Sequence, residues 1–241
     1  MKNVIALGFF DGVHLGHAAI LRGAVSLARE LLMTPTALTY ERPPRAVTRG
    51  GAPLLLTDPE QRSALMRACG VAHVFVLPFT PEFAALSPAQ FVEEILVREF
   101  NCGGVVCGED FRFGKGALGD TAALGLLCAA QGIALSICPP VLRGTRAVSS
   151  TAVRAAVAEG DLQEAAAMLG RPYTLRLYRE DDGLYRAPRE MAVPPDGDYL
   201  AAADGGAARA VYFCRAGCAL PECGETCSLT FLERRMHTTG R

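Results

Sequence analysis

The sequence lacks any apolar run near the length that crosses a lipid bilayer, which takes about 20 residues. The apolar stretch near its start, Val4 to Phe10, is shorter than a signal-peptide core, is followed by Asp11 and lacks a cleavage pattern. We therefore expect a cytosolic protein with no membrane partner.

An excess of charge is also absent, since 24 basic and 25 acidic residues give a formal net charge of -1. That balance excludes a strongly basic nucleic-acid binder, and a hydrophobic content of 50% excludes a disordered polymer. Lysine is nearly missing: only Lys2 and Lys115 are lysines. The remaining positive charge is arginine, which suits phosphate but is also what a biased base composition produces. We expect no nucleic-acid partner, and the sequence carries no signal for the number of subunits.

The cysteines argue against a disulfide framework, because nine is an odd number and the expected compartment is reducing. Four of them, Cys214, Cys218, Cys223 and Cys227, are separated by three, four and three residues. Four thiolates could hold zinc and help a small domain fold. The spacing differs from the usual CxxC pair, so reduced or adventitiously paired cysteines are our default interpretation.

Strand-like and helix-like segments alternate from residue 1 to residue 173. Short apolar runs flanked by Gly or Pro are typical of buried parallel strands. They lie at Val4–Gly8, Thr36–Tyr40, His73–Leu77, Gly104–Cys107 and Ile133–Cys138. The helix-like segments between and after them begin at capping residues: Thr57 with Glu60, Ser87 with Pro88 and Gln90, Asp120, and Asp161 with Glu164. The pattern predicts an α/β domain over 1–173, with a five-stranded parallel sheet, helices on both faces and ligands at the carboxyl ends of the strands.

After Tyr173 the pattern changes to short alternating runs separated by Pro and Gly, which is typical of β structure. The runs are Thr174–Arg179, Tyr199–Ala203, Ala210–Cys214 and Ser228–Leu232. Residues 174–241 are close to the lower limit for a core that folds alone. We expect a small β-rich appendage there.

A first candidate phosphate-binding segment is GFFDGVHLGH, from Gly8 to His17. Gly8 and Gly12 allow a sharp turn, and Gly16 lets a phosphate approach the backbone at a helix N-terminus, where unpaired N–H groups favour anions. His14 and His17 lie at the mouth of that turn and can donate hydrogen bonds to phosphoryl oxygens. The alternatives are a βα turn with two solvent-facing polar residues or a metal site, and zinc would need ligands that the segment does not supply.

A second candidate segment is GEDFRFGKGALGD, from Gly108 to Asp120, directly after the fourth predicted strand. Its glycines indicate backbone that a ligand approaches closely, and Phe111 and Phe113 offer faces for a planar ring. An ordinary surface loop is the alternative.

The third candidate segment is VSSTAVR, from Val148 to Arg154. Ser149, Ser150 and Thr151 begin a helix, so hydroxyls and backbone N–H groups can hold the outer phosphates of a nucleotide, with Arg154 about one turn further in. A plain helix cap with a surface arginine is the alternative.

Taken together, these segments resemble a known family. The HxGH turn and the hydroxyl-rich helix start resemble the nucleotidyltransferase superfamily, which implies a Rossmann-like fold. Within it, the three segments together with LLTDPEQR (within 54–62) and LGRPY (169–173) resemble the adenylyltransferase module of bacterial bifunctional riboflavin kinase/FAD synthetase, over about residues 1 to 173. The resemblance implies binding of ATP and Mg²⁺, and transfer of AMP to FMN to give FAD and pyrophosphate.

The same resemblance guides the roles that we assign. His14 and His17 are assigned to the α- and β-phosphates, and Ser150, Thr151 and Arg154 to the departing pyrophosphate. The nucleotide pocket is assigned to Gly8, Phe9 and Asp11, and the adenine or flavin to Asp110 and the nearby phenylalanines.

The chain departs from the family in two places. After the second predicted strand it reads Thr39-Tyr40-Glu41-Arg42-Pro43-Pro44 where a TFDPHP-like segment is common, so a histidine is absent and Arg42 or Arg45 is the candidate anion contact. After Tyr173 the glycine-rich segment and the Pro-Thr-Ala-Asn motif of the flavokinase domain are missing. We interpret 174–241 as a shortened, cysteine-rich remnant of a flavokinase-like barrel and expect no riboflavin kinase activity.

Two other functions stay open. One is a related HxGH nucleotidyltransferase that acts on a different phosphorylated acceptor, which the GEDFRFG segment disfavours. The other is a flavin or nucleotide sensor without turnover, which the set of His14, His17, Ser150, Thr151 and Arg154 disfavours, because a decayed site has no physical need for them.

Overall fold

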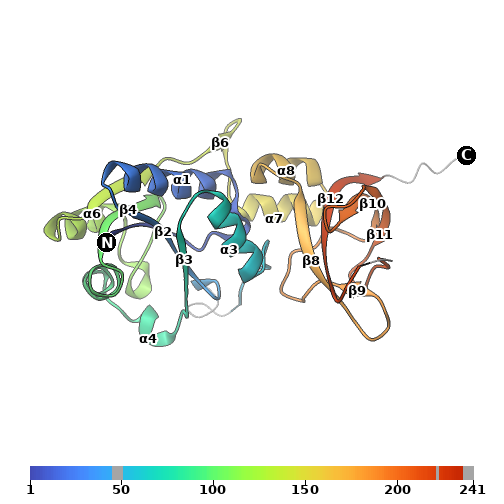
Figure 1. The fold of residues 1–241 in the computed structure, drawn as a ribbon, viewed down its shortest axis with the longest axis horizontal. Helices are drawn as coiled ribbons and strands as arrows, with labels where there is room; N and C mark the ends of the chain where they lie inside the picture. Colours follow the sequence, from blue (N-terminus) through green and yellow to red (C-terminus); the bar gives the residue numbers. More distant parts are fainter. Residues whose placement is uncertain (45–50, 221–222, 236–241) are drawn as a thin grey trace, which may run out of the picture. The chain divides into compact units, whose positions relative to one another are not determined.

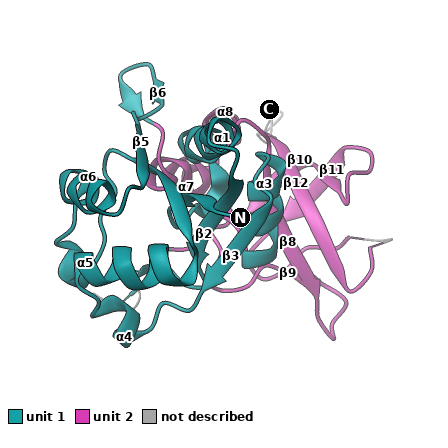
Figure 2. Cartoon of the chain, turned by 60° about the vertical axis from the view of Figure 1, so that its left-hand side comes forward, with its two compact units in different colours: residues 1–53, 59–147 teal, residues 54–58, 148–241 magenta. Residues whose placement is uncertain are grey.

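The computed structural model describes residues 1–44, 51–220 and 223–235. The chain forms two compact units, one of residues 1–53 and 59–147 and one of residues 54–58 and 148–241, coloured separately in Figure 2. This division differs from the predicted boundary at residue 173, which stays a prediction about domains.

The first unit is built on a parallel sheet with the strand order β3-β2-β1-β4-β5 (Figure 1). Its strands are β1 (Asn3–Leu7), β2 (Thr34–Tyr40), β3 (His73–Leu77), β4 (Cys102–Gly108) and β5 (Ala134–Cys138). The predicted five-stranded α/β architecture is confirmed. The chain moves outward from β1 to β3 on one side and then continues at β4 on the other, so the strand order reverses between β1 and β4. In open α/β sheets, ligands bind at the carboxyl ends of the strands at such a reversal.

Helices cover both faces of this sheet. Successive strand residues point to opposite faces, so β1 contributes side chains to two separate buried clusters. Val4 and Ala6 belong to a buried cluster with residues of α1 (Leu15–Glu30) and α3 (Pro59–Ala68). Ile5 and Leu7 belong to a second cluster with residues of the π-helix η2 (Phe91–Glu99) and of α6 (Thr121–Ala130). The shorter elements of this unit are η1 (Asp11–Val13), α4 (Pro81–Ala84), α5 (Pro88–Gln90), η3 (Lys115–Ala117), β6 (Leu142–Arg143) and β7 (Arg146–Ala147).

The helix starts follow the capping residues of the sequence, with one difference. Ser87 and Gln90 form the predicted capping box at α5, which continues directly into η2, and Asp120 accepts a hydrogen bond from the Ala123 N–H at 2.9 Å. Helix α3 begins at Pro59, one residue later than a cap at Thr57 would place it. Proline suits the first helical position, because its missing N–H would have no partner inside the helix there.

The second unit contains α7 (Ser150–Glu159), α8 (Leu162–Leu169) and an antiparallel sheet with the order β11-β10-β12-β8-β9. Its strands are β8 (Tyr173–Arg179), β9 (Tyr185–Arg186), β10 (Gly197–Ala203), β11 (Arg209–Phe213) and β12 (Thr226–Arg235). Tyr199, Phe213 and Phe231 are buried together with ring centroids 5.2 to 6.5 Å apart. The predicted β-rich C-terminal part is confirmed.

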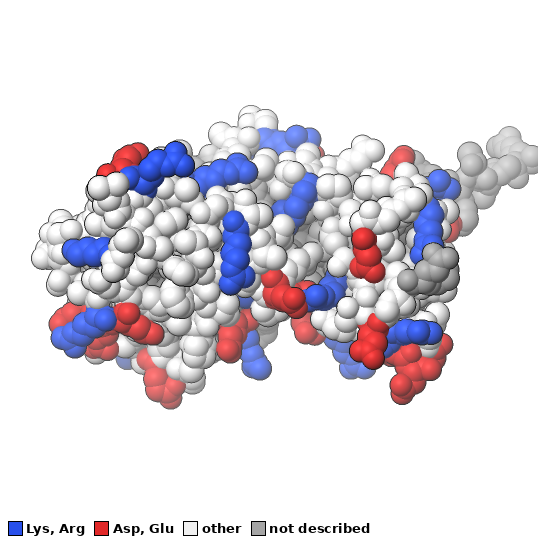
Figure 3. Space-filling model, in the orientation of Figure 1, with Lys and Arg blue, Asp and Glu red and all other residues white. Residues whose placement is uncertain are grey.

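The charged side chains are mixed in sign on the surface (Figure 3), as the near-neutral net charge predicts. Figure 3 shows basic and acidic side chains interspersed over the face that it draws. Within the described ranges, we find no helix that combines the length and the apolar character needed to span a membrane.

Candidate active site

The turn after β1 is shaped by residues in left-handed backbone conformations. Phe10, Gly12 and Val13 have φ values of 57°, 77° and 39°. Glycine adopts such values freely, whereas a β-branched residue such as Val13 is strained there. Strained backbone of this kind persists only where the surrounding structure holds it in place, and it is frequent at active sites and ligand-binding segments.

Gly8 has a different purpose from the one predicted. It has no left-handed φ, but a Cβ at this position would lie 3.0 Å from the ring of Phe10, which is fully buried. Gly8 therefore makes room for the Phe10 ring, and Gly12 supplies the left-handed turn.

His14 and His17 lie together at the start of α1. His14 is the N-cap residue, and its Nδ1 accepts a hydrogen bond from the backbone N–H of His17 at 3.3 Å. The two imidazoles are stacked, with centroids 3.7 Å apart and an interplanar angle of 19°. Because Nδ1 of His14 is the acceptor, the proton of a neutral His14 ring lies on Nε2, which can donate to a ligand. The predicted histidine pair thus lies together at a helix N-terminus.

The rest of this turn is fixed by buried polar residues of the first unit. The Thr39 hydroxyl, fully buried in β2, donates to the carbonyl of Phe9 at 2.8 Å. The guanidinium of Arg62 lies 4.4 Å from the centroid of the Phe9 ring and donates to the carbonyl of Tyr40 at 2.7 Å. Asp11 is a second charged residue here, with only 2% of its surface exposed. Gly16 is the second residue of α1, so the first helical turn carries no side chain at that position.

Sequence reasoning did not single out Thr39 and Arg62 as part of this site. Arg62 is fully buried, which is rare for an arginine unless it is paired. The signal that could have found it is its place at the end of the LLTDPEQR segment. Of the proposed substitutes for the absent histidine, Arg42 is exposed and Arg45 lies outside the described residues.

The second candidate segment leaves β4 at the same edge of the sheet, because β1 and β4 are parallel neighbours with Ala6 opposite Val106. Phe111 and Phe113 are stacked, with centroids 5.7 Å apart and an interplanar angle of 13°. A Cβ at Gly108 would lie 3.1 Å from the carboxylate of Asp110, so the backbone and this side chain approach closely. The structure therefore brings the predicted residues of the first two segments to one edge.

A row of aromatic rings extends from this segment toward the end of β2. Neighbouring centroids in the row are 5.0 to 6.1 Å apart, a normal separation for packed aromatic side chains. Burial raises the pKa of the Tyr40 hydroxyl, which stays neutral at physiological pH. The members of the row are Tyr40, Phe79, Phe83, Phe91, Phe113 and Phe111.

The glycines of the second segment are explained largely by the loop itself. Gly114 and Gly116 have φ values of 71° and 64°, and a Cβ at Gly119 would lie 2.6 Å from the Phe113 ring. Phe113 and Gly119 also exchange two backbone hydrogen bonds of 3.1 and 2.9 Å. Gly119 therefore makes room for the Phe113 ring, whereas Gly114 and Gly116 supply left-handed turns of the loop.

We expect Gly119→Ala to lower the free energy of unfolding by about 1–3 kcal/mol, because the added methyl group must displace the buried Phe113 ring. Gly125→Ala is the matched control. Gly125 lies inside α6, and a Cβ there would be 3.7 Å from the Leu135 side chain, which is an ordinary contact. Alanine at this position should stabilise the helix by about 1 kcal/mol. Urea unfolding of both variants makes the comparison, and wild-type stability of Gly119→Ala would refute the assigned packing role.

The third candidate segment begins a helix as predicted. Ser149 is the N-cap of α7, and its hydroxyl accepts a hydrogen bond from the Ala152 N–H at 3.2 Å. Ser150 and Thr151 are the first two residues of the helix, and the Arg154 guanidinium lies 3.5 Å from the Thr151 hydroxyl. These residues belong to the second unit, so their place beside His14 and His17 stays a prediction.

The four cysteines of the tail do not gather into one group. Within the described part of the chain, the metal-ligating side chains that cluster in a set of three or more are Asp204, Cys223 and Cys227. The Cys214 thiol lies 3.1 Å from the carbonyl of Gly217, and burial raises the pKa of Cys218 to about 11.

The sequence is similar to a known protein family and to several of its members. The sequence model of a family described as FAD synthetase matches residues 1–152. A bifunctional riboflavin kinase/FMN adenylyltransferase of Listeria monocytogenes is 34% identical over 178 residues, which are 73% of this chain and 56% of that protein. One of Escherichia coli is 32% identical over 173 residues, which are 71% of this chain and 55% of that protein. The chain thus spans about half the length of these relatives.

The chain is also similar to a shorter relative and to a solved structure. A protein of Listeria monocytogenes named FAD synthetase is 32% identical over 172 residues, which are 70% of this chain and 69% of that protein. A crystal structure described as a macrolide-efflux protein from Streptococcus pneumoniae covers 100% of this chain and 88% of its own, with a TM-score of 0.86 and 23% identity. At that identity, the structural likeness is evidence for the fold alone.

Proposed function

Since the chain belongs to the FAD synthetase family, we propose that it transfers AMP from ATP to the phosphate of FMN and releases FAD and pyrophosphate. The observation that carries this proposal is the stacked pair of His14 and His17 at the N-terminus of α1, where the strand order of the parallel sheet reverses. Imidazole donors and helix N–H groups at that place favour a bound polyphosphate.

The proposed chemistry is a single in-line displacement. An oxygen of the FMN phosphate forms a bond to the α-phosphorus of ATP, while the bond between that phosphorus and the bridging oxygen of the β-phosphate breaks and pyrophosphate leaves. A phosphate monoester has a second pKa of about 6, so it attacks at neutral pH without giving up a proton to a general base. The tasks left to the protein are positioning and stabilisation of charge.

Each group of residues has a proposed task. His14 donates from Nε2 to an oxygen of the α-phosphate, and His17 donates to the β-phosphate. Ser150, Thr151 and Arg154 hold the departing pyrophosphate, with Ser149 capping their helix. The residues proposed to contact the nucleotide and the flavin are Gly8, Phe9, Asp11, Gly16, Gly108, Asp110, Phe111 and Phe113.

Mg²⁺ fits this site as an ion that is held mainly by the nucleotide phosphates. It prefers oxygen ligands, and it is commonly bound through one or two carboxylates together with substrate phosphates. The turn between Gly8 and His17 contains one carboxylate, the buried Asp11. We propose that Asp11 supports the ion, which neutralises phosphate charge when bound.

Removal of divalent cations tests this requirement. We expect excess EDTA to abolish FAD formation and added Mg²⁺ to restore it, because the phosphates of ATP repel an incoming anion unless their charge is neutralised. The measurement is chromatographic detection of FAD in matched reactions. Full activity with EDTA would contradict the role proposed for the ion.

A panel of acceptors tests the substrate assignment against the two other functions. The protein is incubated with ATP, Mg²⁺ and one of FMN, pantetheine phosphate, glycerol phosphate or a nicotinamide nucleotide, and pyrophosphate release is measured. Release that is greatest with FMN supports the proposal, and greater release with another acceptor overturns it. Binding of ATP and FMN without release of pyrophosphate identifies a sensor.

A further inference from the structure

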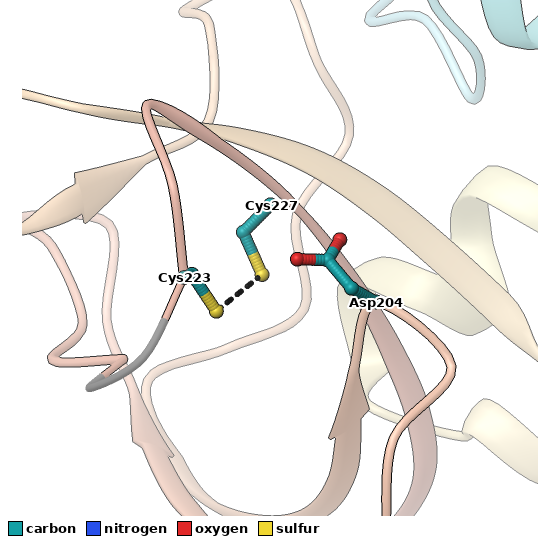
Figure 4. A group of neighbouring side chains, drawn as sticks. All are labelled: Asp204, Cys223 and Cys227. Atoms are coloured by element: carbon teal, nitrogen blue, oxygen red, sulfur yellow. Dashed lines mark hydrogen bonds between the residues drawn. The ribbon is translucent and has the colours of Figure 1, made fainter.

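The second unit brings together three side chains of the types that ligate metals. Asp204, Cys223 and Cys227 place one carboxylate oxygen and two sulfurs all within 4.8 Å of one another (Figure 4). Asp204 follows β10, Cys223 precedes β12 and Cys227 lies within β12, so the group connects separate segments of one sheet. No task in FAD formation has been assigned to any of them.

The distances suit a tetrahedral cation with thiolate ligands. The two sulfurs lie 3.3 Å apart. With a zinc–sulfur bond of about 2.3 Å, two thiolates on one tetrahedral zinc lie about 3.8 Å apart. Small side-chain rotations at Cys223 and Cys227 are enough to reach that separation.

Each ligand is held in place by contacts outside the group. The Asp204 carboxylate accepts a hydrogen bond from the Ser228 N–H at 2.8 Å, and the Asp204 N–H donates to the Ser228 carbonyl at 2.9 Å. The Tyr185 hydroxyl lies 2.7 Å from the carbonyl of Cys223, and Cys227 is paired with Leu177 of β8. Ligands that are positioned in advance lose less conformational freedom on binding.

The electrostatics of the group also favour a cation. Two thiolates and a carboxylate at this spacing repel one another in the absence of a cation, and a dication removes that repulsion.

We propose that Asp204, Cys223 and Cys227 bind one zinc ion, with water in the fourth position on the exposed side of Asp204. Binding breaks the two S–H bonds and releases both protons to solvent, while two Zn–S bonds and one Zn–O bond to Asp204 replace waters of the hydrated ion, which keeps one water. The ion would join the turn after β10 to the start of β12 and stabilise the second unit. Zinc suits this ligand set because it takes thiolate and carboxylate ligands together and needs no redox chemistry.

Zinc titration of the full chain, reduced and freed of metal, tests the proposal. We expect one zinc per chain for the wild type, and loss of that ion in Cys223→Ser and in Cys227→Ser. Cys214→Ser and Cys218→Ser are matched controls, since Cys214 is half-buried like Cys223 and Cys218 is buried like Cys227. Both controls should keep one zinc.

Asp204→Asn separates ligation from folding. Asparagine still accepts the hydrogen bond from Ser228 and tolerates the left-handed backbone of this residue, whose φ is 48°. Its neutral amide is a poor zinc ligand, so we expect affinity to fall at least tenfold while circular dichroism stays unchanged.

Several results would overturn the proposal. They are the absence of zinc binding by the reduced wild type, full binding by the Cys223→Ser and Cys227→Ser variants, and loss of zinc in the Cys214→Ser or Cys218→Ser controls while they remain folded. Substitution with Co²⁺ adds an independent readout, because thiolate ligands give charge-transfer absorption that Asp204→Asn retains and Cys223→Ser loses. A Cys223–Cys227 disulfide that persists after reductant treatment would also contradict a metal site.

Discussion

Replacement of His14 or His17 by alanine is expected to lower kcat for FAD formation about 10²- to 10³-fold, with a smaller change in KM for ATP and FMN. Both imidazoles lie at the N-terminus of α1 in a stacked pair, where they can meet charge on the α- and β-phosphates. Loss of one donor aimed at developing charge costs about 2.7–4 kcal/mol in the transition state. Steady-state kinetics of FAD formation give both constants.

Two control variants separate this effect from a loss of structure. His14→Asn keeps a side chain that can cap α1, so its stability should stay close to that of the wild type while kcat falls. His73→Ala removes an exposed imidazole at the amino end of β3, whereas His14 and His17 follow the carboxyl end of β1. This variant should leave kcat unchanged. Wild-type turnover in both alanine variants would refute the roles assigned to the two histidines.

With riboflavin and ATP as substrates, the protein is expected to form no detectable FMN and therefore no FAD. A flavokinase must hold Mg-ATP and activate a ribityl hydroxyl, which requires a phosphate-binding loop, a metal-binding hydroxyl or amide and a positioned base. Residues 174–241 contain no glycine-rich turn followed by Thr and Asn. Of the candidate bases in this part, Glu225 and Glu233 are exposed, and Glu222 lies outside the described residues.

The same reaction with FMN in place of riboflavin is the control, since it should yield FAD from the same preparation. Long incubations followed by chromatography of the flavins give the sensitivity that the comparison needs. FMN formed from riboflavin by the pure chain would mean that the second unit contains a working kinase site.

The parallel sheet could be predicted because its strands are short, apolar and bounded by Gly or Pro. His73–Leu77 was predicted residue for residue, and the other four strands differ by one or two residues at their ends. The β strands of the tail followed from their alternation, but β9 did not, because the two residues Tyr185 and Arg186 are too few to show a period. The π-helical form of η2 could not be predicted either, since its apolar pattern suits an α-helix equally well.

The candidate site could be located but not built from the sequence. The order of motifs and strands places the Gly8–His17 turn and the Gly108–Asp120 segment at one edge. The stacking of His14 on His17, the burial of Arg62 and the use of Gly119 to accommodate Phe113 depend on tertiary packing. The sequence could not predict that Asp204 lies beside Cys223 and Cys227, because only the pairing of β10 with β12 brings these residues together.

The most direct test of the proposed function follows the phosphates of ATP. The protein is incubated with FMN, Mg²⁺ and ATP labelled in either the α- or the γ-phosphate, and the flavin products are separated. Transfer of AMP predicts that the α-label enters FAD and that the γ-label is released in pyrophosphate. Absence of the α-label from the flavin, in a preparation that binds both FMN and ATP, would contradict the assignment.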